Sequence, residues 1–170
     1  GHERGGGAGA SGSGPIGYEG LVMVVGVLAL QGGFAEHEAA LERLGVAHRP
    51  VRTPKDLEGL AGLIIPGGES TTLGILATAG GLMEPLRSFA ATRPVWGVCA
   101  GLVFLARDPG RQQVTLRLMD MEVARNAYGR QRESFAAWVR VDGLDEFPGV
   151  FIRAPRLVRW GAHCVPMAWR

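Results

Sequence analysis

The sequence has few cysteines, little net charge and no long apolar run, and each shortage excludes a class of protein. Its 170 residues include two cysteines, too few for a secreted disulfide scaffold, and neither belongs to a C-x-x-C metal or redox pair. The 18 basic and 16 acidic residues leave a net charge of +2, so charge alone supports neither nucleic-acid nor membrane binding. No apolar run approaches the roughly 20 residues of a membrane helix, and no signal peptide is visible. These absences predict a cytoplasmic protein with reduced thiols.

Length and composition predict one folded domain behind a disordered extension. Hydrophobic residues make up 46% of the chain, and a core of this size forms without metal or disulfide. Residues 1–22 begin with a long Gly- and Ser-rich stretch that has little apolar surface to bury, so we expect them to be disordered. The ordered pattern begins at Met23, and residues 23–170 are expected to form the domain.

Short apolar segments alternate along the chain with segments of helical spacing. The strand candidates are 23–30, 46–51, 60–65, 94–98, 121–125, 136–141 and 150–153, and the helix candidates are 34–44, 69–79, 82–91 and 100–107. This alternation predicts an α/β fold with a parallel or mixed sheet covered on both faces. Ligands of such sheets bind at the carboxyl ends of the strands, where glycine-rich segments follow residues 30, 65 and 98.

The sharpest local signal is Gly97-Val98-Cys99-Ala100-Gly101, a G-x-C-x-G pattern between a predicted strand and a predicted helix. It is the cysteine version of the nucleophile elbow, in which a strained turn exposes the nucleophile. The glycines are needed because a Cβ there would meet neighbouring backbone. A helix N-terminus favours the thiolate, and the N–H after the cysteine can help to hold an oxyanion. The alternative is a small buried core cysteine.

The second signal is the sequence LIIPGGESTTLGIL, in which a Gly-Gly turn follows an apolar strand. Such a turn exposes backbone N–H groups at the start of a helix, which suits an anion or an oxyanion. The alternative is an ordinary strand-to-helix turn, with Ser70 or Thr71 as the helix cap.

Five segments together resemble one family, the glutaminase subunits of pyridoxal 5′-phosphate synthase. The segments are LALQGGFAEHEAALERLG, IIPGGESTTLGIL, GVCAGLVFLA, VARNAYGRQRESF and GVFIRAP, in family order and with family-like spacing. The resemblance implies a three-layer α/β sandwich of the class-I glutamine amidotransferase (flavodoxin-like) type, with a mixed, mostly parallel sheet that lacks its C-terminal elements. It also implies hydrolysis of L-glutamine to glutamate and ammonia, and delivery of the ammonia to a separate synthase subunit in a hetero-oligomer. No metal or cofactor is implied on this subunit.

The resemblance also assigns roles to particular residues. Cys99 is the implied nucleophile, and Gly67, Gly68 and Ala100 are the implied oxyanion hole. The residues implied to bind L-glutamine are Gly68, Glu69, Ser70, Arg125, Ile152 and Arg153. These assignments are chemically coherent, because the carboxylate of glutamine needs a cation and its ammonium needs acceptors. The plainer interpretation of Arg125 and Arg153 is that they are surface or ion-pair arginines.

The sequence departs from the family in two places. The family has a His-Pro-Glu segment some thirty residues after F-I-R-A-P, whereas this chain ends at Arg170 without one, so no triad His or Glu is assigned. Such a chain is expected to leave part of its sheet uncovered. His163 is the one histidine considered as a substitute base, and His37 is interpreted as solvated. Arg117 stands where the family more often has Gly.

Three other functions stay open at this point. The first is a catalytically inactive docking subunit, which would keep the contacts to the synthase without glutaminase activity. The second is an elbow-cysteine hydrolase of another kind. The R-N-A-Y-G-R-Q and F-I-R-A-P segments argue against it, because such hydrolases lack them. The third is an amidotransferase of another pathway, against which the same two segments speak.

Overall fold

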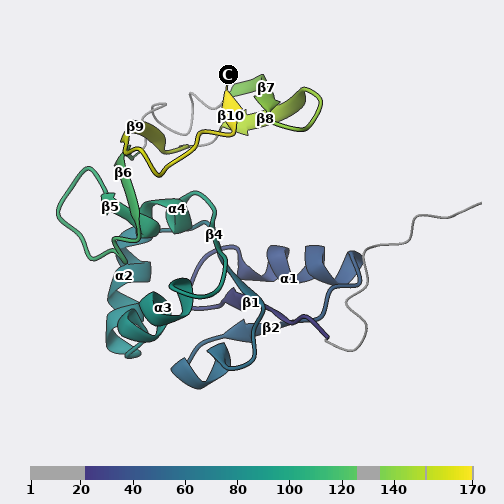
Figure 1. Cartoon of the computed structure of the whole chain (residues 1–170), viewed down its shortest axis with the longest axis vertical. Helices are drawn as coiled ribbons and strands as arrows, with labels where there is room; N and C mark the ends of the chain where they lie inside the picture. The colour runs from purple at the N-terminus through teal and green to yellow at the C-terminus, as the bar shows by residue number, and fades with distance from the viewer. Residues whose placement is uncertain (1–21, 126–134, 152, 170) are drawn as a thin grey trace, which may run out of the picture.

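A four-stranded parallel sheet lies at the centre of the computed structural model, which describes residues 22–125, 135–151 and 153–169 (Figure 1). Its strands are β1 (Val25–Leu28), β2 (His48–Val51), β3 (Gly62–Ile65) and β4 (Val95–Gly97). They lie side by side in the order β2-β1-β3-β4, and every neighbouring pair is parallel. The carboxyl ends of all four strands therefore meet at one edge, where a ligand site is expected.

Helices cover both faces of this sheet, because successive side chains of a buried strand point to opposite faces. The helices are α1 (Phe34–Arg43), α2 (Ser70–Ala79), α3 (Met83–Ala90) and α4 (Ala100–Leu105), with a short 3₁₀ helix, η1 (Pro54–Leu57). Ile64 packs with Val27 and with Leu41 of α1 on one face. Its neighbours Leu63 and Ile65 belong to the core on the other face, together with residues of α2, α3 and α4. The predicted three-layer α/β arrangement is confirmed.

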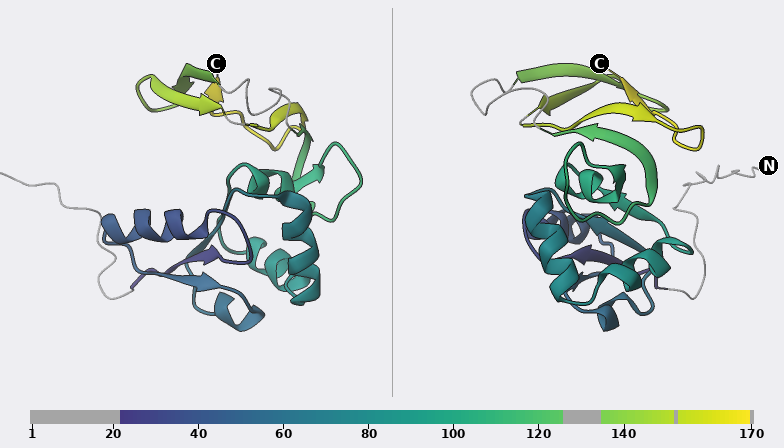
Figure 2. Two further views of the ribbon diagram at one scale, coloured as in Figure 1. Left: turned by 180° about the vertical axis from the view of Figure 1, so that it is seen from behind. Right: turned by 90° about the vertical axis from the view of Figure 1, so that its left-hand side faces the viewer.

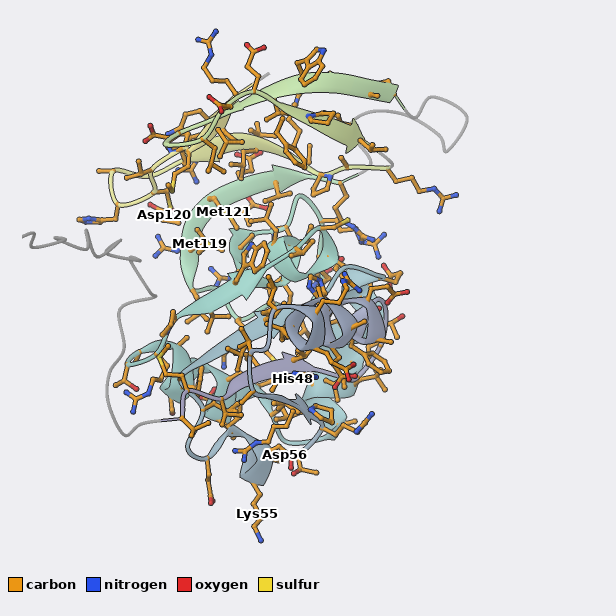
Figure 3. All side chains as sticks on the ribbon, turned by 90° about the vertical axis from the view of Figure 1, so that its right-hand side faces the viewer. His48, Lys55, Asp56, Met119, Asp120 and Met121 are labelled. Carbon is orange, nitrogen blue, oxygen red and sulfur yellow. The ribbon has the colours of Figure 1, made fainter. Side chains whose placement is uncertain are left out.

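The chain after α4 forms two smaller sheets at one end of the molecule (Figure 2). One contains β5 (Ala106–Asp108), β6 (Met119–Ala124) and β9 (Arg156–Trp160), in the order β5-β6-β9. The other contains β7 (Phe135–Val141), β8 (Phe147–Phe151) and β10 (Ala168–Trp169), in the order β10-β7-β8. Figure 3 shows Met119, Asp120 and Met121 of β6 toward this end, and His48 and Asp56 in the opposite half.

Most predicted elements of the parallel unit are confirmed, and the differences lie after Cys99. The predicted helix 100–107 ends at Leu105, because Ala106 to Asp108 pair with β6. The predicted strand 150–153 lies instead at Phe147–Phe151, and β9 and β10 were not predicted. In the described part of the chain, the later strands do not join the parallel sheet. The predicted disordered extension lies outside the described residues, except for Val22.

Large apolar side chains are exposed on the strands of the two smaller sheets. Trp138 is 65% exposed and Trp160 is 47% exposed. Of the helices that the structure describes, none is long and apolar enough to cross a membrane.

Helix α4 packs unusually close to β3, and Gly101 is the point of contact. A Cβ at position 101 would collide with the backbone carbonyl of Ile65, and a Cβ at Gly97 would lie 2.6 Å from the backbone of Gly101. Neither obstacle is a flexible side chain. Both glycines of the G-x-C-x-G pattern are therefore required by backbone packing, as predicted.

We expect Gly101→Ala to lower the free energy of unfolding by about 1–3 kcal/mol, because α4 must move away from β3. Urea unfolding followed by circular dichroism measures this change. The control is Ala79→Ser, which adds one heavy atom at an exposed helical position and is expected to change stability by under about 0.5 kcal/mol. Equal stability of Gly101→Ala and the wild type would show that α4 has room to shift.

Arg117 has a φ of 57°, in the left-handed region that favours glycine. We expect Arg117→Gly to raise the free energy of unfolding by about 0.5 kcal/mol, since relief of strain slightly exceeds the added chain entropy. Arg117→Ala is the matched control, because it removes the side chain and keeps the strained backbone. The prediction is wrong if thermal unfolding shows the same stability for both variants.

Candidate active site

Cys99 lies in the turn between β4 and α4, at the carboxyl edge of the parallel sheet. Its backbone has a φ of 49°, a strained conformation for a residue with a Cβ, and its side chain is exposed. Two backbone hydrogen bonds fix the turn: Val98 N–H donates to Ile65 O at 3.0 Å, and Gly101 N–H donates to Val98 O at 2.8 Å. Ala100 is the first residue of α4, so its N–H is not used within the helix.

The Gly67-Gly68 turn lies directly beside Cys99. A Cβ on Gly67 would be 3.4 Å from the Cβ of Cys99, so the two residues face each other without a side chain between them. Gly33 N–H donates to Gly67 O at 3.1 Å, and the Gln31 side-chain oxygen accepts the Glu69 N–H at 2.8 Å. The Gln31 amide nitrogen is buried and has no hydrogen-bond partner among the described residues. The turn is thus held from the loop after β1.

Glu69 caps α2 and also binds Arg125. One carboxylate oxygen accepts the Thr72 N–H at 2.7 Å and the Thr72 hydroxyl at 3.0 Å, and the other accepts Arg125 Nη2 at 2.7 Å. Partial burial raises the pKa of Glu69, but hydrogen bonds from the Thr72 and Thr71 backbone, the Thr72 hydroxyl and Arg125 outweigh it and lower the pKa to about 2. The cap is Glu69, and not Ser70 or Thr71.

Gln113 connects Arg125 to the start of α2. Its side-chain oxygen accepts Arg125 Nη1 at 2.9 Å, and its side-chain nitrogen donates to Ser70 Oγ at 3.1 Å. Arg125 Nη1 also reaches the Thr71 hydroxyl at 3.3 Å, and Arg111 donates to that hydroxyl. Gln113 was not predicted as a site residue, because it lies in an irregular loop far from α2 in sequence.

The structure brings most of the predicted site residues to one edge. Gly67 adjoins Cys99, and Glu69, Ser70 and Arg125 form a single hydrogen-bonded group through Gln113. Arg153 lies in an exposed bend after β8 with a φ of 46°, and no described contact joins it to this group. Ile152 lies outside the described residues. The roles assigned to these residues stay predictions.

The described histidines are engaged elsewhere or exposed. His37 contacts the ring of Trp96 edge-on, with ring centroids 6.1 Å apart, and His48 Nδ1 lies 3.0 Å from Val46 O. His163 is exposed in the loop after β9. Within the described ranges, no imidazole is hydrogen-bonded to Cys99, and no group of three or more potential ligands could hold a metal ion.

Residues 27–166 match the model of the SNO glutamine amidotransferase family, which is most of the chain. This chain belongs to that family. The exposed Cys99 elbow and the adjacent glycine turn are thus features of a glutamine amidotransferase fold. The family assignment rules out an unrelated elbow-cysteine hydrolase.

Individual relatives of the SNO family agree with this assignment. The chain is 55% identical to the pyridoxal 5′-phosphate synthase subunit PdxT of Deinococcus radiodurans over 147 residues, which cover 82% of this chain and 75% of the relative. It is 55% identical to the PdxT of Corynebacterium diphtheriae over 143 residues, covering 82% and 77%. It is 53% identical to the PdxT of Thermus thermophilus over 142 residues, covering 81% and 74%.

Solved structures agree on the fold. A crystal structure described as a glutamine amidotransferase superposes with a TM-score of 0.79 at 46% identity, covering 85% of this chain and 78% of that one. A putative GMP synthase protein from Thermoplasma acidophilum superposes with a TM-score of 0.60 at 18% identity, covering 87% and 73%. The second match supports the fold alone.

We expect Glu69→Gln to weaken the start of α2 in a pH-dependent way. The pKa of Glu69 is lowered by folding, so its carboxylate stabilises the fold fully above pH 4.5, and this contribution is lost as the pH falls toward about 2. At pH 7 the variant should be less stable by about 1 kcal/mol, and near pH 2 the difference should vanish.

Urea unfolding at a series of pH values measures this difference. Glu42→Gln is the control, because it removes the same charge from an exposed position on α1. A constant difference between Glu69→Gln and the wild type from pH 7 to pH 2 would contradict the prediction.

Proposed function

We propose that this chain hydrolyses L-glutamine to glutamate and ammonia as the glutaminase subunit of a pyridoxal 5′-phosphate synthase. The observation that carries the proposal is the exposed Cys99 on its elbow, directly beside the Gly67-Gly68 turn. Membership of the SNO glutamine amidotransferase family and the 55% identity to two PdxT subunits support the same function. The cytoplasm is the proposed location, in agreement with the expected reduced thiols.

In the proposed reaction Cys99 attacks the side-chain amide of glutamine. The thiolate sulfur bonds to the amide carbon, and the carbonyl electrons move to oxygen. The resulting oxyanion would be held by N–H groups of the Gly67-Gly68 turn and of Ala100. When this intermediate collapses, the C–N bond breaks and the leaving nitrogen takes up one proton to depart as ammonia. A thioester remains on Cys99. Water then adds to the thioester carbon, glutamate leaves and the thiol is restored.

The group around Glu69 is the proposed binding site for the amino-acid end of glutamine. Arg125 would bind the substrate carboxylate, since its side chain is only 19% exposed and its planar fork matches a carboxylate. Gly68, Glu69 and Ser70 would line the same subsite. Ile152 and Arg153 are proposed as further contacts to L-glutamine from the resemblance alone.

The ammonia is proposed to pass to a separate synthase subunit. The relatives carry the printed name of a synthase subunit, and this chain would dock to such a partner in a hetero-oligomer. No cofactor or metal is proposed for this subunit.

A docking subunit without glutaminase activity is the second candidate function. One specific observation favours it: among the described residues no imidazole is hydrogen-bonded to Cys99, although a thiol nucleophile needs a proton acceptor and the leaving ammonia needs a proton donor. A single measurement distinguishes the two candidate functions.

That measurement is the release of ammonia from L-glutamine by this chain mixed with a cognate synthase subunit. We expect ammonia release that Cys99→Ala reduces to the background rate, because the sulfur forms the covalent bond. The Cys164→Ala variant is the control, since it removes the other cysteine, which donates to Asp120 O of β6. Binding to the synthase without ammonia release would favour the docking function, and equal activity of Cys99→Ala and the wild type would contradict the proposed chemistry.

A further inference from the structure

We propose that Gln113 is a positioning residue that sets the orientation and the charge balance of the glutamine subsite. The inference rests on the proposed function, because it concerns the same subsite. It is carried by the three contacts of the Gln113 carboxamide: Arg125 at 2.9 Å, Ser70 at 3.1 Å and Thr71 at 3.4 Å. Gln113 acts on the substrate through Arg125.

The backbone that carries Gln113 is firmly anchored. Leu116 N–H donates to Phe104 O at 2.8 Å, Leu118 N–H donates to Leu105 O at 2.9 Å, and the buried Thr115 hydroxyl donates to Ala106 O at 2.8 Å. Arg87 of α3 reaches the carbonyl of Leu116 at 3.1 Å. The loop is therefore tied to α4, β5 and α3 directly after its contact with α2.

The same loop presses closely on α2, one turn beyond Ser70. A Cβ at Gly74 would lie 2.7 Å from Val114 O, so the absence of a side chain at position 74 permits the approach. Val114 is the next residue after Gln113. Packing at Gly74 thus determines how far the Gln113 carboxamide reaches toward Ser70 and Thr71.

The contacts of Arg125 show why an uncharged side chain is needed at position 113. Glu69 already provides one carboxylate for Arg125, at 2.7 Å from Nη2. Arg125 and Arg111, which donates to the Thr71 hydroxyl, leave the group with one surplus positive charge beside Glu69. A carboxylate at position 113 would cancel this surplus and weaken the attraction for the carboxylate of an amino-acid substrate. The amide oxygen of Gln113 orients Nη1 without adding charge, so Arg125 keeps its attraction for an anion.

The test is saturable alkylation of Cys99 by a chloroketone analogue of L-glutamine, compared with alkylation by iodoacetamide, which needs no amino-acid subsite. For Gln113→Glu we expect the half-saturating concentration of the analogue to rise about tenfold, the equivalent of one lost interaction of about 1.4 kcal/mol. The maximal alkylation rate and the iodoacetamide rate should stay those of the wild type. Gln113→Asn keeps the amide on a shorter side chain, and its half-saturating concentration should lie between those of the wild type and Gln113→Glu.

Gln112→Glu is the matched control, because it places the same charge on the exposed neighbouring residue. An unchanged half-saturating concentration in Gln113→Glu, or the same rise in Gln112→Glu, overturns the inference and leaves the proposed function intact. Absence of saturation in the wild type itself overturns the proposed function and the inference with it. A changed iodoacetamide rate in both Gln113 variants also overturns the inference, because it shows a general effect on the fold.

Discussion

The close backbone contact between Gly101 and Ile65 is the constraint on which the rest of the site depends. It places the first turn of α4 directly over the end of β3, so the turn that carries Cys99 has no freedom to relax. The strain at Cys99, with its φ of 49°, is held by hydrogen bonds to β3 and by this packing. The Gly67-Gly68 turn starts only two residues after Ile65, and it therefore arrives beside the thiol.

The polar half of the site is built on a different principle. Glu69, Arg125 and Gln113 come from the start of α2, the end of β6 and the loop between β5 and β6, and hydrogen bonds hold them together. In the ion pair of this group, the Glu69 side chain is half exposed to solvent, whereas the Arg125 side chain is mostly buried. Such a group is more sensitive to charge than to volume, whereas the elbow is more sensitive to volume than to charge.

The elbow and the parallel sheet could be predicted from the sequence because their signals are local. Apolar runs such as that ending at Ile65 indicate a strand, and the pattern around Cys99 indicates a turn between a strand and a helix. Strand β9 could not be predicted, since Arg156 to Trp160 are all exposed and show no alternation of apolar and polar residues. Gln113 could not be predicted either, because its 43-residue separation from Ser70 leaves no periodic trace. The family resemblance alone assigned Arg125 and Glu69 to one binding site, and their direct contact was not predicted.

The position of Arg125 directly after β6 has a consequence for how the molecule, in its proposed function, would lose its selectivity. The backbone of β6 is bonded to β5 and β9 and not to the parallel sheet, whereas its Met121 and Val123 are buried in the same core as β3 and α4. Fraying of the chain just beyond Val123 would remove Arg125 from Glu69 while the shared core, β3, β4 and α4 stay folded. The molecule in that state would still present a reactive sulfur, but it would no longer distinguish an amino acid from any other small electrophile. In the proposed function, chemical reactivity and substrate discrimination would therefore reside in parts of the fold that can be lost one without the other.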